Sequence, residues 1–218
     1  MDTYQIDGLI FDFDGVLVDT AADIASAANH VLQQYGMPAV PVGIVRSYIG
    51  GGAEALIRRV LPEAPEDRLR DAAALFKTKY GECYDVQTSL YPGVQEVLEH
   101  FLAAGKRMAI ATNKGEHFTR GLVRKLGLHR YVGLVVGPES VARRKPDPEC
   151  VELILRHWRV GPERTLLIGD AADDILAGRA AGTLTCGALY GYGAERDIRD
   201  ARPDWVIRSI RELPGLIS

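Results

Sequence analysis

A carboxylate stands inside a short apolar and aromatic segment near the start of the chain. Residues 9–13 read Leu-Ile-Phe-Asp-Phe and turn at Asp14-Gly15, a pattern typical of a buried strand that ends in a turn. An ionised Asp12 is costly there unless a cation or dense hydrogen bonding compensates for its burial. A turn explains Asp14-Gly15, but it does not explain Asp12. Two carboxylates so close together at a strand end favour a hard cation with oxygen ligands, and Mg²⁺ fits best.

Short apolar runs recur along the chain and predict a parallel sheet. They do not alternate between apolar and polar residues, which suits strands covered on both faces. From residue 91 onward helical patterns alternate with these runs, so the order indicates an α/β fold with right-handed crossovers. The predicted strands cover residues 9–13, 108–112, 133–136, 165–168 and 183–189, and the predicted helices of this part cover residues 94–104, 118–126, 148–158 and 174–181.

The region of residues 17–88 does not show this alternation of strands and helices. Helical patterns occur there on either side of Gly50-Gly-Gly52, without a convincing strand. At roughly 70 residues the region is too long for an ordinary loop, so we predict an inserted all-helical cap domain. The expected domains are a catalytic core of residues 1–16 and 89–218 and a helical cap of residues 17–88, with cap helices over 20–35, 53–60 and 66–80.

Composition excludes several classes of partner. The 218 residues are 47% hydrophobic and 25% charged, and the formal net charge of −3 gives no hint of a nucleic-acid or membrane surface. No apolar run approaches the roughly 20 residues of a membrane span, and the polar start is neither a signal nor a transit peptide. The 3 cysteines form no C-x-x-C pair, which indicates free thiols in a reducing compartment. We therefore expect a cytoplasmic protein without nucleic-acid or membrane partners.

Acidic residues also follow the fourth predicted strand, at the edge of the sheet where ligands bind in open parallel sheets. Asp170 comes after that strand and a glycine, so it would give the cation a third carboxylate. Asp173 and Asp174 fall in the first turn of the next helix, where carboxylates cap the helix and interact favourably with its dipole. Both roles are compatible if Asp174 holds a metal-bound water while Asp173 caps, and the spacing slightly favours Asp174 for function.

A hydroxyl, an amide and a lysine follow the other predicted strands. Thr112 and Asn113 either turn the chain or bind phosphate oxygens through the hydroxyl and the adjacent backbone N–H. Lys145 could be an ordinary surface lysine, but the two prolines that come after it stiffen this loop. A site with three or more carboxylates and a phosphate dianion would stay strongly negative with Mg²⁺ alone. A fixed Lys145 resolves that imbalance.

These clusters, in this order, resemble the four motifs of the haloacid dehalogenase superfamily of phosphotransferases. The resemblance covers essentially the whole chain and implies a Rossmann-like core with a helical cap inserted after the first motif. Ala171 departs from the pattern, because relatives often carry serine there, which would loosen a supporting hydrogen bond. The matching segments are Asp12-Phe-Asp-Gly-Val-Leu-Val-Asp-Thr20, Thr112-Asn-Lys114, Lys145-Pro-Asp-Pro148 and Gly169-Asp-Ala-Ala-Asp-Asp174.

The resemblance implies a role for each matching residue. Asp12 is the nucleophile and a metal ligand, and Asp14 is the general acid/base whose backbone carbonyl also binds Mg²⁺. Thr112 and Lys145 hold the transferring phosphoryl group. The remaining metal ligand is Asp170, and Asp174 matches the last acidic position of the fourth motif. Dehalogenases are disfavoured, because their pattern lacks an acid at the position of Asp14.

The expected reaction is hydrolysis of a small phosphomonoester through an aspartyl-phosphate. A carboxylate nucleophile divides one hard step into two. Asp14 protonates the leaving alcohol and then deprotonates the water that hydrolyses the intermediate. Phosphoryl transfer otherwise needs in-line positioning and charge neutralisation, which lysine and Mg²⁺ supply.

Within the superfamily, the chain is most similar to the phosphoglycolate phosphatase group. Gly51 and Gly52 either form a flexible turn or let backbone amides approach the substrate. Arg58 and Arg59 follow on the same helix, and Arg59 is our candidate for a substrate contact, although an ordinary surface arginine is the alternative. The features that carry this similarity are Tyr48-Ile-Gly-Gly-Gly52, Thr112-Asn-Lys114, the helix that leads into Leu126-Gly-Leu128, and Tyr190-Gly-Tyr-Gly193.

Related activities fit the same core residues. A β-phosphoglucomutase-like phosphotransferase would differ in its cap contacts and in the group that accepts the phosphoryl group. A pyrophosphatase or a sugar-phosphate phosphatase is equally compatible. A non-catalytic phosphate-binding module is disfavoured, because binding alone needs no nucleophile and acid in register. We expect a small phosphorylated metabolite as the ligand, and both a monomer and a homodimer stay open.

Overall fold

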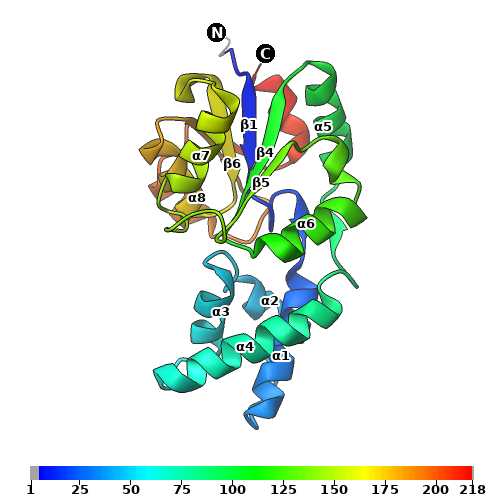
Figure 1. Cartoon of the computed structure of the whole chain (residues 1–218), viewed down its shortest axis with the longest axis vertical. Helices are drawn as coiled ribbons and strands as arrows, with labels where there is room; N and C mark the ends of the chain where they lie inside the picture. Colours follow the sequence, from blue (N-terminus) through cyan, green and yellow to red (C-terminus); the bar gives the residue numbers. More distant parts are fainter. Residues whose placement is uncertain (1–4, 218) are drawn as a thin grey trace. The chain divides into compact units, whose positions relative to one another are not determined.

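A six-stranded parallel sheet lies at the centre of the larger part of the chain, in the order β5-β4-β1-β6-β7-β8. The computed structural model describes residues 5–217. β1 lies between β4 and β6, so the residues that follow these three strands share one edge of the sheet (Figure 1). The predicted α/β fold with a parallel sheet is confirmed. The strands are β1 (Gly8–Phe11), β4 (Arg107–Ala111), β5 (Leu134–Val136), β6 (Thr165–Gly169), β7 (Leu184–Ala188) and β8 (Trp205–Ile207).

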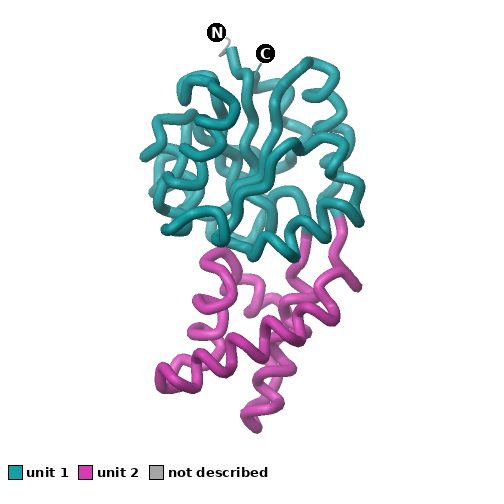
Figure 2. The backbone as a smooth tube through the Cα atoms, viewed as in Figure 1, with its two compact units in different colours: residues 1–18, 90–218 teal, residues 19–89 magenta. Residues whose placement is uncertain are grey.

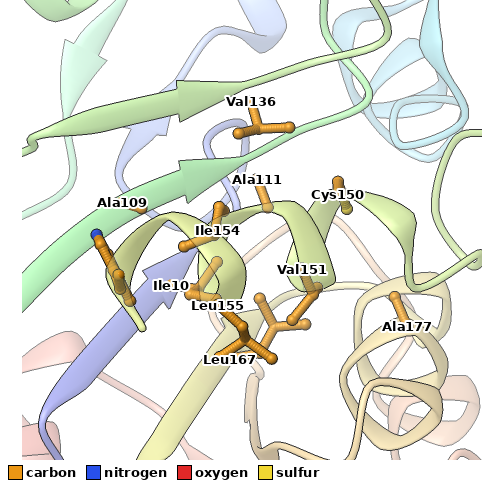
Figure 3. Packing of buried hydrophobic residues seen from close by; sticks show 11 residues of the cluster. Ile10, Ala109, Ala111, Val136, Cys150, Val151, Ile154, Leu155, Leu167 and Ala177 are labelled. Carbon is orange, nitrogen blue, oxygen red and sulfur yellow. The ribbon is translucent and has the colours of Figure 1, made fainter. Parts of the chain in front are cut away.

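Helices cover both faces of this sheet. The connection from β4 to β5 moves toward one side of the sheet, and the connection from β5 to β6 moves back toward the other side. Because both crossovers are right-handed, α6 lies on one face of the sheet and α7 on the opposite face. One core cluster joins apolar side chains of α7 to the buried Ile10 of β1, Ala109 of β4 and Leu167 of β6 (Figure 3). The helices are α5 (Val94–Ala103), α6 (Glu116–Lys125), α7 (Glu149–Trp158), α8 (Ala172–Ala180) and α9 (Glu195–Asp200).

The chain divides into two compact units (Figure 2). Unit 1, with the sheet, comprises Met1–Val18 and Leu90–Ser218, and unit 2 comprises Asp19–Ser89. Two short strands, β2 (Val18–Asp19) and β3 (Ser89–Leu90), pair where the chain passes from one unit to the other.

Unit 2 is helical. α1 packs chiefly against α4, and α3 also packs against α4. The buried carboxylate of Asp23 in α1 accepts the backbone N–H of Thr88 at 2.9 Å and its hydroxyl at 2.8 Å, which ties the first helix to the end of the unit. The helices are α1 (Ala21–Gln34), α2 (Val42–Arg46), α3 (Gly52–Val60) and α4 (Glu66–Cys83).

The structure differs from the predicted elements mainly at short segments. β8, α2 and α9 are not predicted, because each spans only three to six residues and presents no clear apolar period. β1 ends at Phe11, so Asp12 follows the strand and does not lie within it. Pro148 precedes α7 as its N-cap, whereas the sequence places it in the first turn. Among residues 5–217, none of the helices combines the length and the hydrophobicity of a membrane span.

Candidate active site

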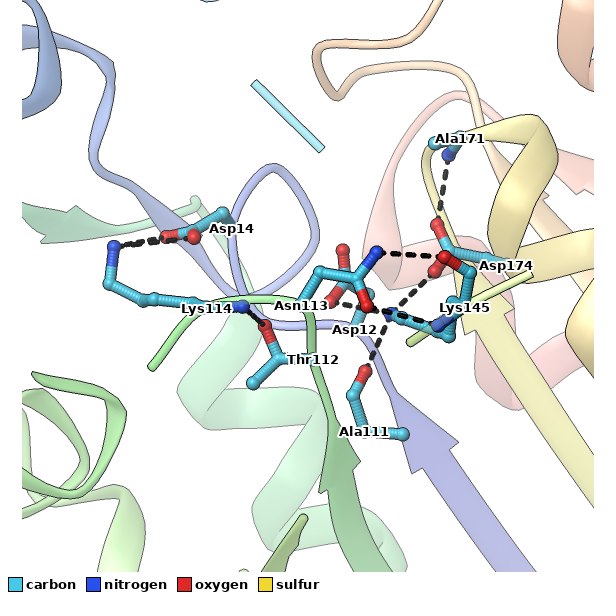
Figure 4. A network of polar contacts seen from close by, with 9 residues as sticks. All are labelled: Asp12, Asp14, Ala111, Thr112, Asn113, Lys114, Lys145, Ala171 and Asp174. Atoms are coloured by element: carbon cyan, nitrogen blue, oxygen red, sulfur yellow. Dashed lines mark hydrogen bonds and ion pairs between the residues drawn. The ribbon is translucent and has the colours of Figure 1, made fainter. Parts of the chain in front are cut away.

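Lys145 joins carboxyl groups that follow two different strands. Its Nζ lies 2.9 Å from Oδ1 of Asp12, just after β1, and 2.6 Å from Oδ1 of Asp174, in the first turn of α8 (Figure 4). A third contact, at 2.6 Å, reaches the backbone carbonyl of Ala111 at the end of β4. These three acceptors match the three N–H donors of an ammonium group. Only 2% of the Lys145 side chain is exposed, so the predicted surface alternative is wrong.

Asn113 holds the backbone of the loop that carries Lys145. Its side-chain Nδ2 donates to the carbonyl of Lys145 at 3.1 Å, and its Oδ1 accepts the backbone N–H of Lys145 at 3.1 Å. This reciprocal pair connects the segment after β4 to the segment between β5 and α7. The predicted phosphate contact of Asn113 uses its backbone N–H. The side-chain hydrogen bonds to Lys145 are compatible with that contact, because they do not involve this N–H.

Three buried carboxyl groups gather at the sheet edge. One carboxylate oxygen each from Asp12, Asp170 and Asp174 lies within 4.8 Å of the others. Asp170, after β6, accepts the backbone N–H of Tyr192 at 2.6 Å. Asp174 accepts the backbone N–H of Ala171 at 3.0 Å and so caps α8, which is one of the roles that the sequence allows for both Asp173 and Asp174.

Burial sets the electrostatics of this cluster. It raises the pKa of Asp12 to about 7, although the ammonium of Lys145 opposes the shift. Burial, followed by the charges of Asp12 and Asp174, raises the pKa of Asp170 well above its usual range. Burial also opposes the charge of Lys145, but Asp12 and Asp174 outweigh it and raise the pKa of the lysine. These raised pKa values mean that the single ammonium of Lys145 does not fully compensate the three buried carboxyl groups, and their converging oxygens fit a divalent cation such as Mg²⁺.

Three glycines allow the backbone to pass close to Asp170. A Cβ on Gly15, whose φ is +84°, would lie 2.0 Å from Oδ2 of Asp170. A Cβ on Gly191 would lie 2.4 Å from the same oxygen, and one on Gly193 would lie 2.0 Å from the backbone carbonyl of Asp170. Sequence reasoning missed this contact and used the Gly-Tyr-Gly segment only as a family feature. The spacing of two glycines directly after a strand was the available signal.

Asp14 belongs to a second contact, apart from the Lys145 group (Figure 4). Lys114 Nζ lies 3.1 Å from Oδ1 and 3.2 Å from Oδ2 of Asp14, and 7% and 11% of the lysine and aspartate side chains are exposed. The backbone N–H of Lys114 donates to Oγ1 of Thr112 at 3.1 Å. Thr112, Lys114 and Asp14 therefore form one connected group. Lys114 is absent from the predicted site residues, since the sequence shows it only as part of a motif.

The predicted substrate-binding residues of unit 2 belong to α3 and its N-cap, with the two glycines at its start and Arg59 in its last turn. Gly51 is the N-cap of this helix and Gly52 its first residue, with φ of +83°, which favours glycine. Arg59 donates from Nη1 to the backbone carbonyl of Tyr48 at 3.0 Å. Their contacts with a substrate stay predictions.

Known proteins resemble this chain along its whole length. The model of the haloacid dehalogenase-like hydrolase family matches residues 9–188. The chain is 38% identical over 217 residues to phosphoglycolate phosphatase of Nitrosospira multiformis, covering 97% of this chain and 96% of the relative. The plasmid phosphoglycolate phosphatase of Cupriavidus necator is 36% identical over 213 residues, or 96% of this chain and 92% of the relative. The crystal structure of a predicted phosphoglycolate phosphatase from Haemophilus somnus superposes with a TM-score of 0.90 at 28% identity and covers 97% of both chains.

Proposed function

The chain belongs to the haloacid dehalogenase-like hydrolase family and is a phosphatase, and we propose that it hydrolyses a small phosphomonoester of the phosphoglycolate type through an aspartyl-phosphate on Asp12. The observation that carries this proposal is the position of Asp12. Its carboxyl group directly follows the central strand and contacts a buried lysine at 2.9 Å, with two further carboxyl groups beside it. The names of the curated relatives support the choice of substrate.

In the proposed reaction, a carboxylate oxygen of Asp12 attacks phosphorus while the bond from phosphorus to the ester oxygen breaks. Asp14 gives its proton to the departing oxygen. Asp14 then takes a proton from water, which attacks the phosphorus of the acyl phosphate and releases inorganic phosphate and free Asp12. Thr112 and Lys145 hold the oxygens of the transferring group, which matters because this reaction depends on positioning and charge neutralisation.

The acidic cluster is the proposed place for Mg²⁺. Asp12, Asp170 and the backbone carbonyl of Asp14 would hold the ion, with Asp174 beside them. Bound there, Mg²⁺ supplies the positive charge that a phosphate dianion requires next to several carboxylates. Lys145 already contacts Asp12 and Asp174, so it orients both groups without the ion.

We assign substrate selection in part to unit 2, as a cap domain that corresponds to the predicted residues 17–88. Gly51, Gly52 and Arg59 are its proposed contacts. The proposed location is the cytoplasm, which the free thiols of Cys83, Cys150 and Cys186 support.

A panel of phosphorylated compounds with and without Mg²⁺ tests this function. The panel holds 2-phosphoglycolate, ethyl phosphate, glucose 1-phosphate, glucose 6-phosphate and pyrophosphate, ranked by kcat/KM. We expect 2-phosphoglycolate to rank first and the Asp12→Asn variant to lose at least about 10³-fold in kcat. A wild-type protein that hydrolyses none of these compounds, or an Asp12→Asn variant with full turnover, would overturn the proposal.

A further inference from the structure

We propose that Lys114 recognises a negative charge on the leaving group, namely a carboxylate carried by the carbon next to the ester oxygen. Lys114 would then be a specificity-determining residue that favours phosphoglycolate-type substrates over uncharged alkyl phosphates. This inference rests on the proposed function, because it assumes that Asp14 is the acid for the ester oxygen.

The position of Lys114 relative to Asp14 carries the argument. An acid must come within hydrogen-bond distance of the oxygen that it protonates. Lys114 Nζ lies 3.1 and 3.2 Å from the two oxygens of Asp14. The ammonium is therefore at most two hydrogen-bond lengths, roughly 6 Å, from the ester oxygen of a bound substrate. A carboxylate on the next carbon lies about 3 Å from that oxygen, as standard bond lengths require, so a substrate that points it toward Lys114 brings it to hydrogen-bond distance.

The two buried lysines of the site serve different parts of a substrate. Lys145 donates hydrogen bonds to Asp12, which is the proposed nucleophile, and to Asp174 and the backbone carbonyl of Ala111. Lys114 pairs instead with Asp14 (Figure 4), the residue that we propose protonates the leaving group. A single cation attracts two carboxylates at once, so contact with Asp14 and contact with a substrate carboxylate are compatible.

The backbone around Lys114 fixes the position of this cation. Its N–H donates to Oγ1 of Thr112, the residue proposed to hold the phosphoryl group. The residue between them, Asn113, is hydrogen-bonded in both directions to the backbone of Lys145. The phosphoryl-binding hydroxyl and the proposed carboxylate-binding ammonium therefore belong to one short, well-anchored segment, which lowers the cost of ordering the site on binding.

The arginines that the sequence suggests for a substrate carboxylate have different surroundings. Arg58 forms a bidentate ion pair with Glu66, in which Nη2 lies 2.7 Å from Oε1 and Nη1 lies 3.0 Å from Oε2, and both side chains are exposed. Arg59 donates to the carbonyl of Tyr48 in an exposed position. Lys114, by contrast, belongs to unit 1 and pairs with the proposed acid, and only 7% of its side chain is exposed.

A matched pair of substrates tests the inference. 2-Phosphoglycolate and its amide have nearly the same shape, but only the acid carries a negative charge next to the ester oxygen. We expect the wild-type enzyme to prefer the acid by at least about 10-fold in kcat/KM. Lys114→Met should lose about 100-fold with the acid and less than about threefold with the amide. Lys114→Arg, which keeps the charge, should retain most of the preference.

Two outcomes would overturn the inference. An equal loss with both substrates would mean that Lys114 only orients Asp14. A wild-type enzyme without preference for the acid would mean that the charge is not recognised. Inhibition by glycolate and by glycolamide gives a second measurement on the unaltered protein, and we expect glycolate to bind at least about 10-fold tighter. If the wild-type protein hydrolyses neither ester, the proposed function itself has failed, which is a separate result.

Discussion

Lys145 is a buried ammonium held between two carboxyl groups and a backbone carbonyl. Breaking such a group by removing one partner leaves uncompensated charge in a dry environment, which costs much more than the loss of an exposed ion pair. The lysine therefore stabilises the fold as well as the proposed phosphoryl site.

The Lys145→Met variant should show both losses. We expect the metal-free variant to lose about 3 kcal/mol of unfolding free energy in urea at about pH 8, because Asp12 and Asp174 lose their shared cation. Lys77→Met is the matched control, since Lys77 pairs with Glu54 at an exposed position, and it should change stability by less than about 1 kcal/mol. Equal stability of the two variants would contradict the account of Lys145.

In contrast to the charge of Lys145, the charge of Asp170 is expected to destabilise the fold when no metal ion is bound. Its charge is disfavoured by burial and by the neighbouring Asp12 and Asp174, which raise its pKa. Asn at this position keeps an oxygen for the N–H of Tyr192 but removes the charge. We expect metal-free Asp170→Asn to melt at or a few degrees above the wild type, and to lose the stabilisation that Mg²⁺ gives the wild type. Thermal unfolding with and without Mg²⁺ measures both effects. A variant that melts lower and still responds to Mg²⁺ like the wild type would argue against the metal site.

Among the elements, the strands that build the site could be predicted because each is an apolar run that stops at a polar residue. Their parallel pairing then brings Asp12, Thr112 and Asp170 to one sheet edge. Contacts made by side chains across the fold could not be predicted. The sequence has no signal that Asn113 binds the backbone of Lys145, or that Lys114 pairs with Asp14, because these partners are distant in the chain and meet only after folding.

A carboxylate clamp joins the start of α6 to the segment after β5. Glu116 Oε1 accepts the backbone N–H of Gly137 at 2.9 Å and the hydroxyl of Ser140, and its Oε2 accepts from Arg120 at 2.8 Å. A further hydrogen bond joins the same two segments, because Oε2 of Glu139 accepts the backbone N–H of Glu116 at 2.9 Å. The two connected segments lead to Lys114 and Lys145, so we expect Glu116 to help position both lysines.

Removing this clamp should affect turnover more than binding. We expect Glu116→Ala to lower kcat about 10-fold, with a smaller change in KM, because small displacements of supporting groups are costly for catalysis. Glu116→Gln keeps an acceptor and should recover part of the loss. The control is Glu96→Ala on α5, which removes an exposed ion pair with Arg211. Steady-state kinetics with an unchanged kcat for Glu116→Ala would contradict the positioning role.

On the scale of the whole molecule, the proposed chemistry belongs to one unit. The proposed nucleophile, acid, metal ligands and phosphoryl-binding groups all lie in unit 1, from segments that follow β1, β4, β5 and β6. The helical unit is inserted between the first strand and the rest of the sheet, and the predicted substrate contacts Gly51, Gly52 and Arg59 belong to it. We therefore expect unit 1 to carry out the reaction and unit 2 to contribute to the choice of substrate, with Lys114 as the proposed specificity-determining residue of unit 1.

The proposed mechanism depends on a covalent intermediate on Asp12, and rapid acid quenching during turnover tests for this intermediate most directly. With saturating 2-phosphoglycolate and Mg²⁺, mass spectrometry should find one phosphoryl group on the peptide that contains Asp12, and hydroxylamine should remove it as it does from acyl phosphates. The Asp12→Asn variant should show no such adduct. Continued turnover by the wild-type protein with no phosphoryl group on Asp12, or with the group on another residue, would contradict the mechanism.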